Sequence, residues 1–121
     1  MTDVAPLFQR VRKSCLSHPG VIEKSSHGAP AFFVTEKAGL FATLWDNHHN
    51  DGNVALFVAA PPGVQEALVE EDPLVFYRPP YYGPSGWIGV RLDKGLDWTQ
   101  VEAMVEEGYA MVKAKHSRKR R

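Results

Sequence analysis

Residues 39–59, GLFATLWDNHHNDGNVALFVA, contain two runs of alternating side chains on either side of a polar turn. Successive side chains of a β-strand point to opposite faces, so the runs 39–45 and 54–59 each predict a strand. Asp51-Gly52 supplies turn chemistry for the connection between them. Both faces of the two runs are apolar, which predicts central strands that are either covered on both sides or partly engaged in another contact.

Helical spacing on either side of this hairpin predicts the two main helices. Apolar residues recur on one face of residues 4–17 behind a candidate N-cap, Asp3, and the stretch 18–20, HPG, ends the pattern. A second helix begins near Asp97 and carries an apolar stripe as far as Val112. Gly108 lies within that stripe, and we expect it to allow a close approach to the sheet.

Shorter elements complete the order. Strands are predicted over 21–25, 31–35, 75–77 and 87–92, and a short helix over Val64–Glu71. The stretch 78–86 holds three Pro and two Gly residues and predicts a shaped loop. This order predicts an α+β fold: an antiparallel sheet of about five strands, with an N-terminal and a C-terminal helix packed on it and a short helix between strands.

The charges of the chain are divided unevenly. Residues 1–112 carry 8 basic and 14 acidic groups, a formal charge of −6, and the last nine residues carry six cations and no carboxylate. These cations are Lys113, Lys115, Arg118, Lys119, Arg120 and Arg121. We therefore expect one folded domain, 1–112, followed by a basic, disordered tail, 113–121. Local basic density of this kind favours contact with a polyanion such as nucleic acid. The alternative is a disordered end that only aids solubility.

Several classes of protein are disfavoured by what the sequence lacks. It has no apolar run of about 20 residues and no signal-peptide pattern at its start, and its lone Cys15 cannot form an internal disulfide. We expect a cytoplasmic protein with no membrane contact, in which Cys15 is a buried helix residue rather than a nucleophile. The absence of a phosphate loop, a nucleophile elbow or paired cysteines predicts no catalytic residues and no cofactor.

Four short motifs occur in an order that resembles the MmcQ/YjbR family of small bacterial proteins. They are 16–21 (LSHPGV), 27–32 (HGAPAF), 81–83 (YYG) and 86–92 (GWIGVRL). The resemblance covers about residues 5–112. It implies a compact α+β fold related in shape to bacterial frataxin, described as a double-wing DNA-binding arrangement, and it implies no reaction.

Frataxins bind iron through acidic residues on their first helix. The corresponding helix here carries Arg10, Arg12 and Lys13, so iron binding is not expected to carry over.

Basic and aromatic side chains form the first candidate site for nucleic acid or another ligand. Its members are Lys24, His27, Arg78, Tyr81, Tyr82, Trp87 and Arg91. Aromatic rings beside guanidinium groups suit stacked bases or phosphate. The structural alternative is that Trp87 packs under other elements, Arg91 pairs with a carboxylate and His27 belongs to a turn.

Two further clusters of polar residues have simpler interpretations. Asp46, His48, His49 and Asp51 could bind a transition metal, but they are crowded into one turn, so we expect a solvated loop and no metal site. The carboxylates of 66–72 and 102–107 are expected to be solvated faces of helices.

The leading hypothesis is a non-enzymatic protein that binds DNA weakly and without sequence preference, through the tail and the aromatic-basic surface. The negative charge of residues 1–112 opposes it. The alternative hypothesis is a small-molecule or protein-binding domain with a pocket near His27, Tyr81 and Trp87.

Overall fold

The structure, a computed structural model, describes residues 4–47 and 52–119. A six-stranded sheet and three α-helices make up the fold, which confirms the predicted α+β class. The elements in chain order are α1 (Val4–Leu16), β1 (Ile22–Ser26), β2 (Ala29–Phe33), β3 (Leu40–Asp46), β4 (Val54–Val58), α2 (Val64–Glu71), β5 (Phe76–Tyr77), a 3-10 turn (Gly83–Ser85), β6 (Ile88–Arg91) and α3 (Trp98–Lys119).

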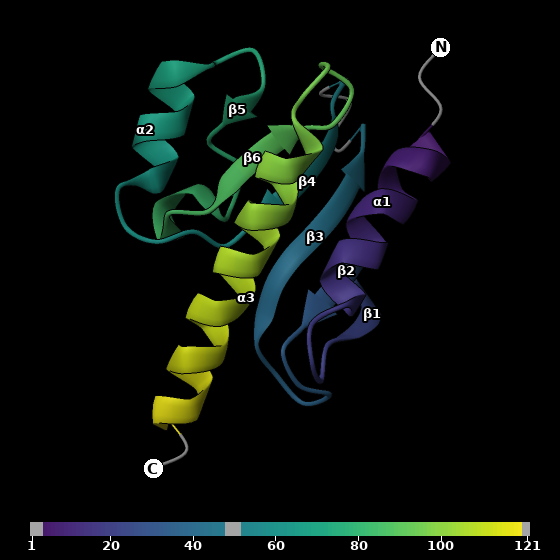
Figure 1. The fold of residues 1–121 in the computed structure, drawn as a ribbon, viewed down its shortest axis with the longest axis vertical. Helices are drawn as coiled ribbons and strands as arrows, with labels where there is room; N and C mark the ends of the chain where they lie inside the picture. Colours follow the sequence, from purple (N-terminus) through teal and green to yellow (C-terminus); the bar gives the residue numbers. More distant parts are fainter. Residues whose placement is uncertain (1–3, 48–51, 120–121) are drawn as a thin grey trace.

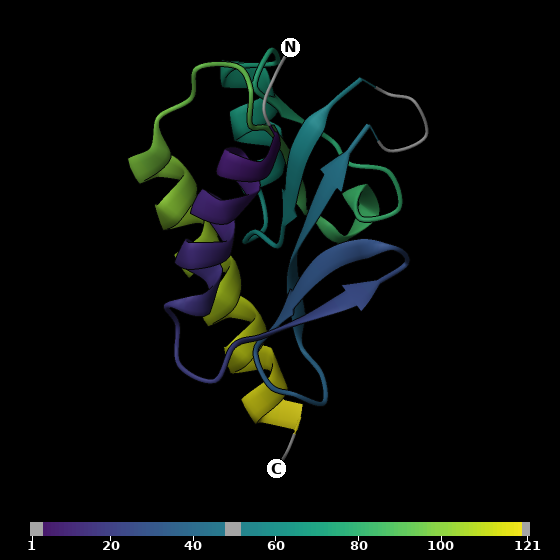
Figure 2. The same cartoon turned by 90° about the vertical axis from the view of Figure 1, so that its right-hand side faces the viewer.

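The strand order in the sheet is β1-β2-β3-β4-β6-β5, and every neighbouring pair is antiparallel. Helices α1 and α3 lie side by side on one face of the sheet, and the loop that contains the 3-10 turn lies on the other face (Figures 1 and 2). The stretch 54–60 is consequently buried at every position. The two-sided cover explains why the central strands are apolar on both faces.

The helical stripes and the strand alternation predict a core of eight residues: Leu7, Val11, Leu56, Val58, Ile88, Val90, Val105 and Tyr109. The structure confirms seven of them. Val11, Leu56, Val58, Ile88, Val90, Val105 and Tyr109 are buried. Leu7, the eighth, is only partly buried in the N-terminal half of α1.

A bulge in β3 alters the predicted alternation at Phe41. The β2–β3 register changes from Phe32 opposite Ala42 to Phe33 opposite Leu40, so β3 accommodates one additional residue. Phe41 is fully buried and packs edge-on against Tyr109 of α3, with ring centroids 5.7 Å apart. A bulge of this kind re-aims a side chain, and here it brings Phe41 to the helix face instead of the opposite face that alternation predicts.

Gly108 allows α3 to lie close to β4, as predicted. A Cβ atom at this position would lie 2.7 Å from the carbonyl oxygen of Ala59 and 3.0 Å from Cγ2 of Val58. Real Cβ atoms do not approach a backbone oxygen this closely, so glycine is the residue that this helix–sheet distance permits.

The C-terminal helix extends further than its apolar stripe. The sequence predicts that the helix ends near Val112, but α3 continues to Lys119, so residues 113–119 form helical turns where a disordered tail was predicted. Ala, Lys and Arg are strong helix formers, and cations near the C-terminus of a helix interact favourably with its macrodipole. The end of the buried face therefore does not end the helix. The predicted domain boundary at residue 112 remains a prediction.

Candidate functional site

The residues of the first candidate site lie in two separate parts of the sheet. Lys24 and His27 belong to the hairpin of edge strand β1, whereas Arg78, Tyr81, Tyr82, Trp87 and Arg91 belong to β6 and to the loop before it. Strands β2, β3 and β4 lie between the two groups. The structure therefore does not bring His27 together with Tyr81 and Trp87, as the predicted pocket requires.

His27 occupies a tight hairpin turn. Because Ser26 pairs with Ala29, only His27 and Gly28 connect β1 to β2, and both have positive φ angles, 53° and 81°. Two positive φ angles are typical of a type I′ turn, whose backbone twist matches that of the flanking strands. The nearby Lys24 ammonium donates a hydrogen bond to the backbone carbonyl of Glu36. The turn interpretation therefore accounts for His27.

Trp87 is part of a buried aromatic cluster. Its ring stacks on Tyr82 with centroids 4.7 Å apart, and Tyr82 in turn meets Phe57 edge-on at 6.1 Å. Trp87 is only 8% exposed, and burial raises the pKa of the Tyr82 hydroxyl. Since these rings cover one another, the packing alternative applies to Trp87, and its faces are not open to a base.

A buried glutamine holds the loop 78–87 against α2. Gln65 is 3% exposed, and its side-chain amide donates hydrogen bonds to the carbonyl oxygens of Gly83 (3.0 Å) and Trp87 (2.5 Å). The Arg78 side chain lies over Gly83, where a Cβ would come within 2.6 Å of its Cγ. Tyr81, by contrast, projects from the loop with 79% of its surface exposed and a φ of 67°.

Arg91 serves to tie together segments of the chain. Its Nε donates to the side-chain oxygen of Asn53 at 3.0 Å, and one terminal nitrogen donates to the carbonyl of Pro73 at 3.1 Å. The guanidinium carbon also lies 4.3 Å from the ring centroid of Tyr77. The structural alternative gave Arg91 a carboxylate partner, whereas the observed partners are the Asn53 amide, a backbone carbonyl and the Tyr77 ring.

The basic part of α3 begins at a residue that is attached to the folded body. The Lys113 ammonium donates to the hydroxyl of Tyr109 at 3.0 Å, and that hydroxyl donates to the carbonyl of Pro19 at 2.7 Å. The His18 ring also stacks on the Tyr109 ring, with the ring centroids 4.7 Å apart. Lys113 therefore has a structural role that the charge pattern alone does not predict.

Beyond Lys113, the basic positions 115, 118 and 119 of α3 share a helical face. Lys115 is exposed, and positions 118 and 119 follow it at i+3 and i+4 spacing, which places the three positions next to one another on α3. This part of α3 extends past the sheet at the end of the molecule opposite α2 (Figure 1). Three carboxylates lie on α2, and Asp72 follows it. The carboxylates of α2 thus lie far from the basic end of α3 along the long axis.

A groove between α1 and α3 was not predicted from the sequence. It is lined by Arg10, Lys13, Ser14, Ser17, His18, Glu102 and Glu106. The residues 10, 13, 14 and 17 follow the i, i+3, i+4, i+7 spacing of one helical face, and residues 102 and 106 are one turn apart. This spacing was the sequence signal from which the groove could have been predicted. A polar helical face ordinarily indicates a solvent-exposed surface, however, so the groove was not expected.

Cys15 is a buried residue of α1, as predicted. It has no exposed surface, and burial raises the pKa of its thiol to about 12, with a smaller contribution from Glu23 in the same direction. The reactive form of cysteine is the thiolate, so the site does not favour nucleophilic chemistry.

His48, His49 and Asp51 lie outside the residues that the structure describes. The predicted absence of a metal site there stays a prediction. Asp46 is described and is exposed.

The fold and the charge distribution define a small α+β protein with a projecting basic helix end. A family model described as YjbR matches residues 16–111, and the chain belongs to the YjbR family. A search among curated proteins found no significant match, and a search among solved structures found none. Among the described residues, no helix combines the length and apolar character that crossing a membrane requires.

Proposed function

We propose that this protein binds nucleic acid weakly and without sequence preference, through the basic C-terminal part of α3. The observation that carries the proposal is the continuation of α3 beyond its buried stripe as a helix rich in Lys and Arg. A helical scaffold holds the cationic positions 115, 118 and 119 together on one face, which suits contact with successive phosphates.

The acidic charge of the rest of the chain opposes nucleic-acid binding, and its placement reduces that opposition. The carboxylates of α2 lie at the other end of the molecule from the end of α3 (Figure 1). Exposed charges further apart than about 8–10 Å are largely screened at physiological salt. The repulsion from the α2 carboxylates therefore acts weakly on a phosphate backbone held at the basic end.

The aromatic-basic surface has a smaller role in this proposal than in the original hypothesis. Trp87, Tyr82 and Arg91 hold the loop and the sheet edge in place. Arg78 and Tyr81 lie three residues apart in the loop before β6, and both side chains are exposed. They lie on the same loop, so a contribution from them is expected to be independent of α3.

The salt dependence of binding tests the number of cations involved. Five basic residues follow Lys113, which itself contacts Tyr109. Displacement of one counterion for each of five contacts gives a slope of log K against log salt no steeper than about −4.5. A salt titration on one labelled duplex would measure this slope for the full chain and for a chain ending at Lys113, a cut that keeps the Tyr109 contact and tests the predicted boundary near residue 112.

A pair of charge reversals separates local basic density from net charge. Lys115→Glu and Lys94→Glu change the net charge equally, but Lys94 lies in the turn before α3 and not on its basic face. We expect Lys115→Glu to weaken binding strongly and Lys94→Glu to change it little. Equal losses would show that only net charge matters, and equal binding by the full and shortened chains would remove α3 from the mechanism.

A further inference from the structure

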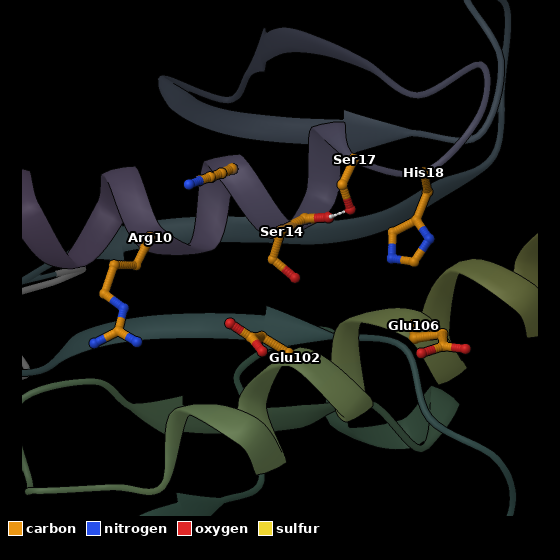
Figure 3. Close-up of a pocket in the computed structure, with 7 residues that line it drawn as sticks. Arg10, Ser14, Ser17, His18, Glu102 and Glu106 are labelled. Atoms are coloured by element: carbon orange, nitrogen blue, oxygen red, sulfur yellow. Dashed lines mark hydrogen bonds between the residues drawn. The ribbon is translucent and has the colours of Figure 1, made fainter.

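The groove between α1 and α3 has walls of opposite charge. Its volume is about 450 Å³, which lies within the range of about 300–1,000 Å³ that is typical of small-molecule sites. Arg10 and Lys13 lie on the α1 wall, and Glu102 and Glu106 lie on the α3 wall. Figure 3 shows Arg10 towards one end of the groove, His18 and Glu106 towards the other, and Glu102 between them.

These charges are not neutralised across the groove. Over residues 4–47 and 52–119, the side-chain ion pair that the structure contains joins Arg12 to Glu23, and neither residue lines the groove. Arg10 instead places its guanidinium over the ring of Trp98, 4.3 Å from the centroid. Stacking uses the flat face of a guanidinium and leaves the N–H donors at its edge able to bind a carboxylate.

Two serines add uncharged polar groups to the α1 wall. The hydroxyl of Ser17 donates to the backbone carbonyl of Ser14 at 2.7 Å, so its oxygen remains an acceptor on the α1 wall. The Ser14 side chain points towards α3 (Figure 3). The groove thus offers hydrogen-bonding groups between its charged ends.

The distance between the charged ends indicates the size of a matching ligand. Trp98, which contacts Arg10, and Glu106 are eight residues apart on α3, or roughly 12 Å at the helical rise of 1.5 Å per residue. An extended chain covers about 3.3–3.6 Å per residue, so three residues span about 10–11 Å. A free amino acid is too short to reach both ends.

We propose that this groove binds a short linear peptide of about three residues, with its free carboxylate at Arg10 and Lys13 and its free ammonium at Glu106. Glu102 and Ser14 contact the peptide between its termini. The site is independent of the basic end of α3, so its failure would leave the nucleic-acid proposal intact.

Blocked peptides test the requirement for both terminal charges. Trialanine, its N-acetyl form and its C-terminal amide would be titrated into the full-length, isotopically labelled protein, and backbone amide shifts would be followed by NMR. Exposed charge pairs are weak, so we expect each blocked form to bind about two- to fivefold more weakly than trialanine. The shifts should be confined to residues 10–18 and 98–106. Equal affinity of the three peptides, shifts elsewhere or no shifts would overturn the proposal.

Variants of the two walls assign each terminus to its partner. Glu106→Gln should remove the preference for the free amine and keep the preference for the free carboxylate, whereas Lys13→Gln and Arg10→Gln should do the reverse. Glu107→Gln is the matched control, because Glu107 is exposed on the same helix turn and does not line the groove. An equal effect of Glu107→Gln and Glu106→Gln would also overturn the proposal.

Discussion

Replacing Gly108 with alanine tests whether the distance between α3 and the sheet is set at this one residue. Two effects oppose each other. Alanine gains about 1 kcal/mol over glycine in a helix interior, but the new Cβ would lie 2.7 Å from the Ala59 carbonyl oxygen and 3.0 Å from Val58. Overpacking a core costs about 1–3 kcal/mol.

The atom that the new methyl group meets decides which effect is larger. A clash with a flexible side chain can be relieved by rotation, but the Ala59 carbonyl belongs to the backbone at the end of β4. The adjacent Ala59 N–H donates to the carbonyl of Phe41 at 2.9 Å, so a shift of this backbone disturbs the β3–β4 pairing. We therefore expect the cost near the upper end of its range and a net destabilisation of about 1–2 kcal/mol by Gly108→Ala.

Equilibrium urea unfolding would measure this change, with Ala110→Gly as the matched control. Ala110 is exposed on the same helix, so its replacement reports the helix-propensity difference alone, a loss of about 1 kcal/mol. If Gly108→Ala stabilised the protein by as much as Ala110→Gly destabilises it, the steric argument would be refuted and the helix–sheet distance would be set elsewhere.

Three further changes test the core and the buried polar groups. Val90→Ala should lower the unfolding free energy by about 1–3 kcal/mol in urea, because Val90 has no exposed surface; an unchanged midpoint would contradict its packing. Gln65→Ala should lower the unfolding free energy by about 1–3 kcal/mol, since the carbonyls of Gly83 and Trp87 lose their hydrogen-bond donor. Wild-type stability of this variant would show that Gln65 does not hold the loop in place. Below pH 9 the Cys15 thiol is neutral in both states; above it the unfolded chain releases the proton first, because burial raises the folded pKa from 9.0 to about 12. The contribution of Cys15 to stability should therefore fall by about 1.4 kcal/mol per pH unit between pH 9 and about 12, and Cys15→Ala should remove this contribution to the slope.

Local pattern was sufficient to predict most elements of the fold. Alternation located β3, β4 and β6, and α2 has the predicted bounds Val64–Glu71, because glycine, proline and capping residues mark these ends in the sequence. Phe41 shows the limit of such reasoning. A bulge inserts one residue into a ladder, and whether it forms depends on a partner strand and a helix that lie far away in sequence.

The grouping of the candidate site could not be predicted for a related reason. Strand alternation predicts that Trp87 and Arg91 share a face of the sheet. It does not predict which strands lie between these residues and His27. The order of strands in the sheet decides this, and β6 lies between β4 and β5 although β5 precedes it in the chain. The end of α3 was predicted too early because the end of an apolar stripe marks the limit of burial, whereas helix formers and terminal cations sustain the backbone beyond it.

The distance between the α2 carboxylates and the basic end of α3 has a consequence for binding at high occupancy. A protein attached to a polyanion by the end of α3 would hold its α2 carboxylates outward, so adjacent attached copies would face one another with like charge. Their mutual repulsion would rise as the lattice of sites fills, and each added copy would bind less favourably than the one before. Occupancy would therefore saturate at a spacing set by ionic strength, wider in dilute salt and closer where the charges are screened.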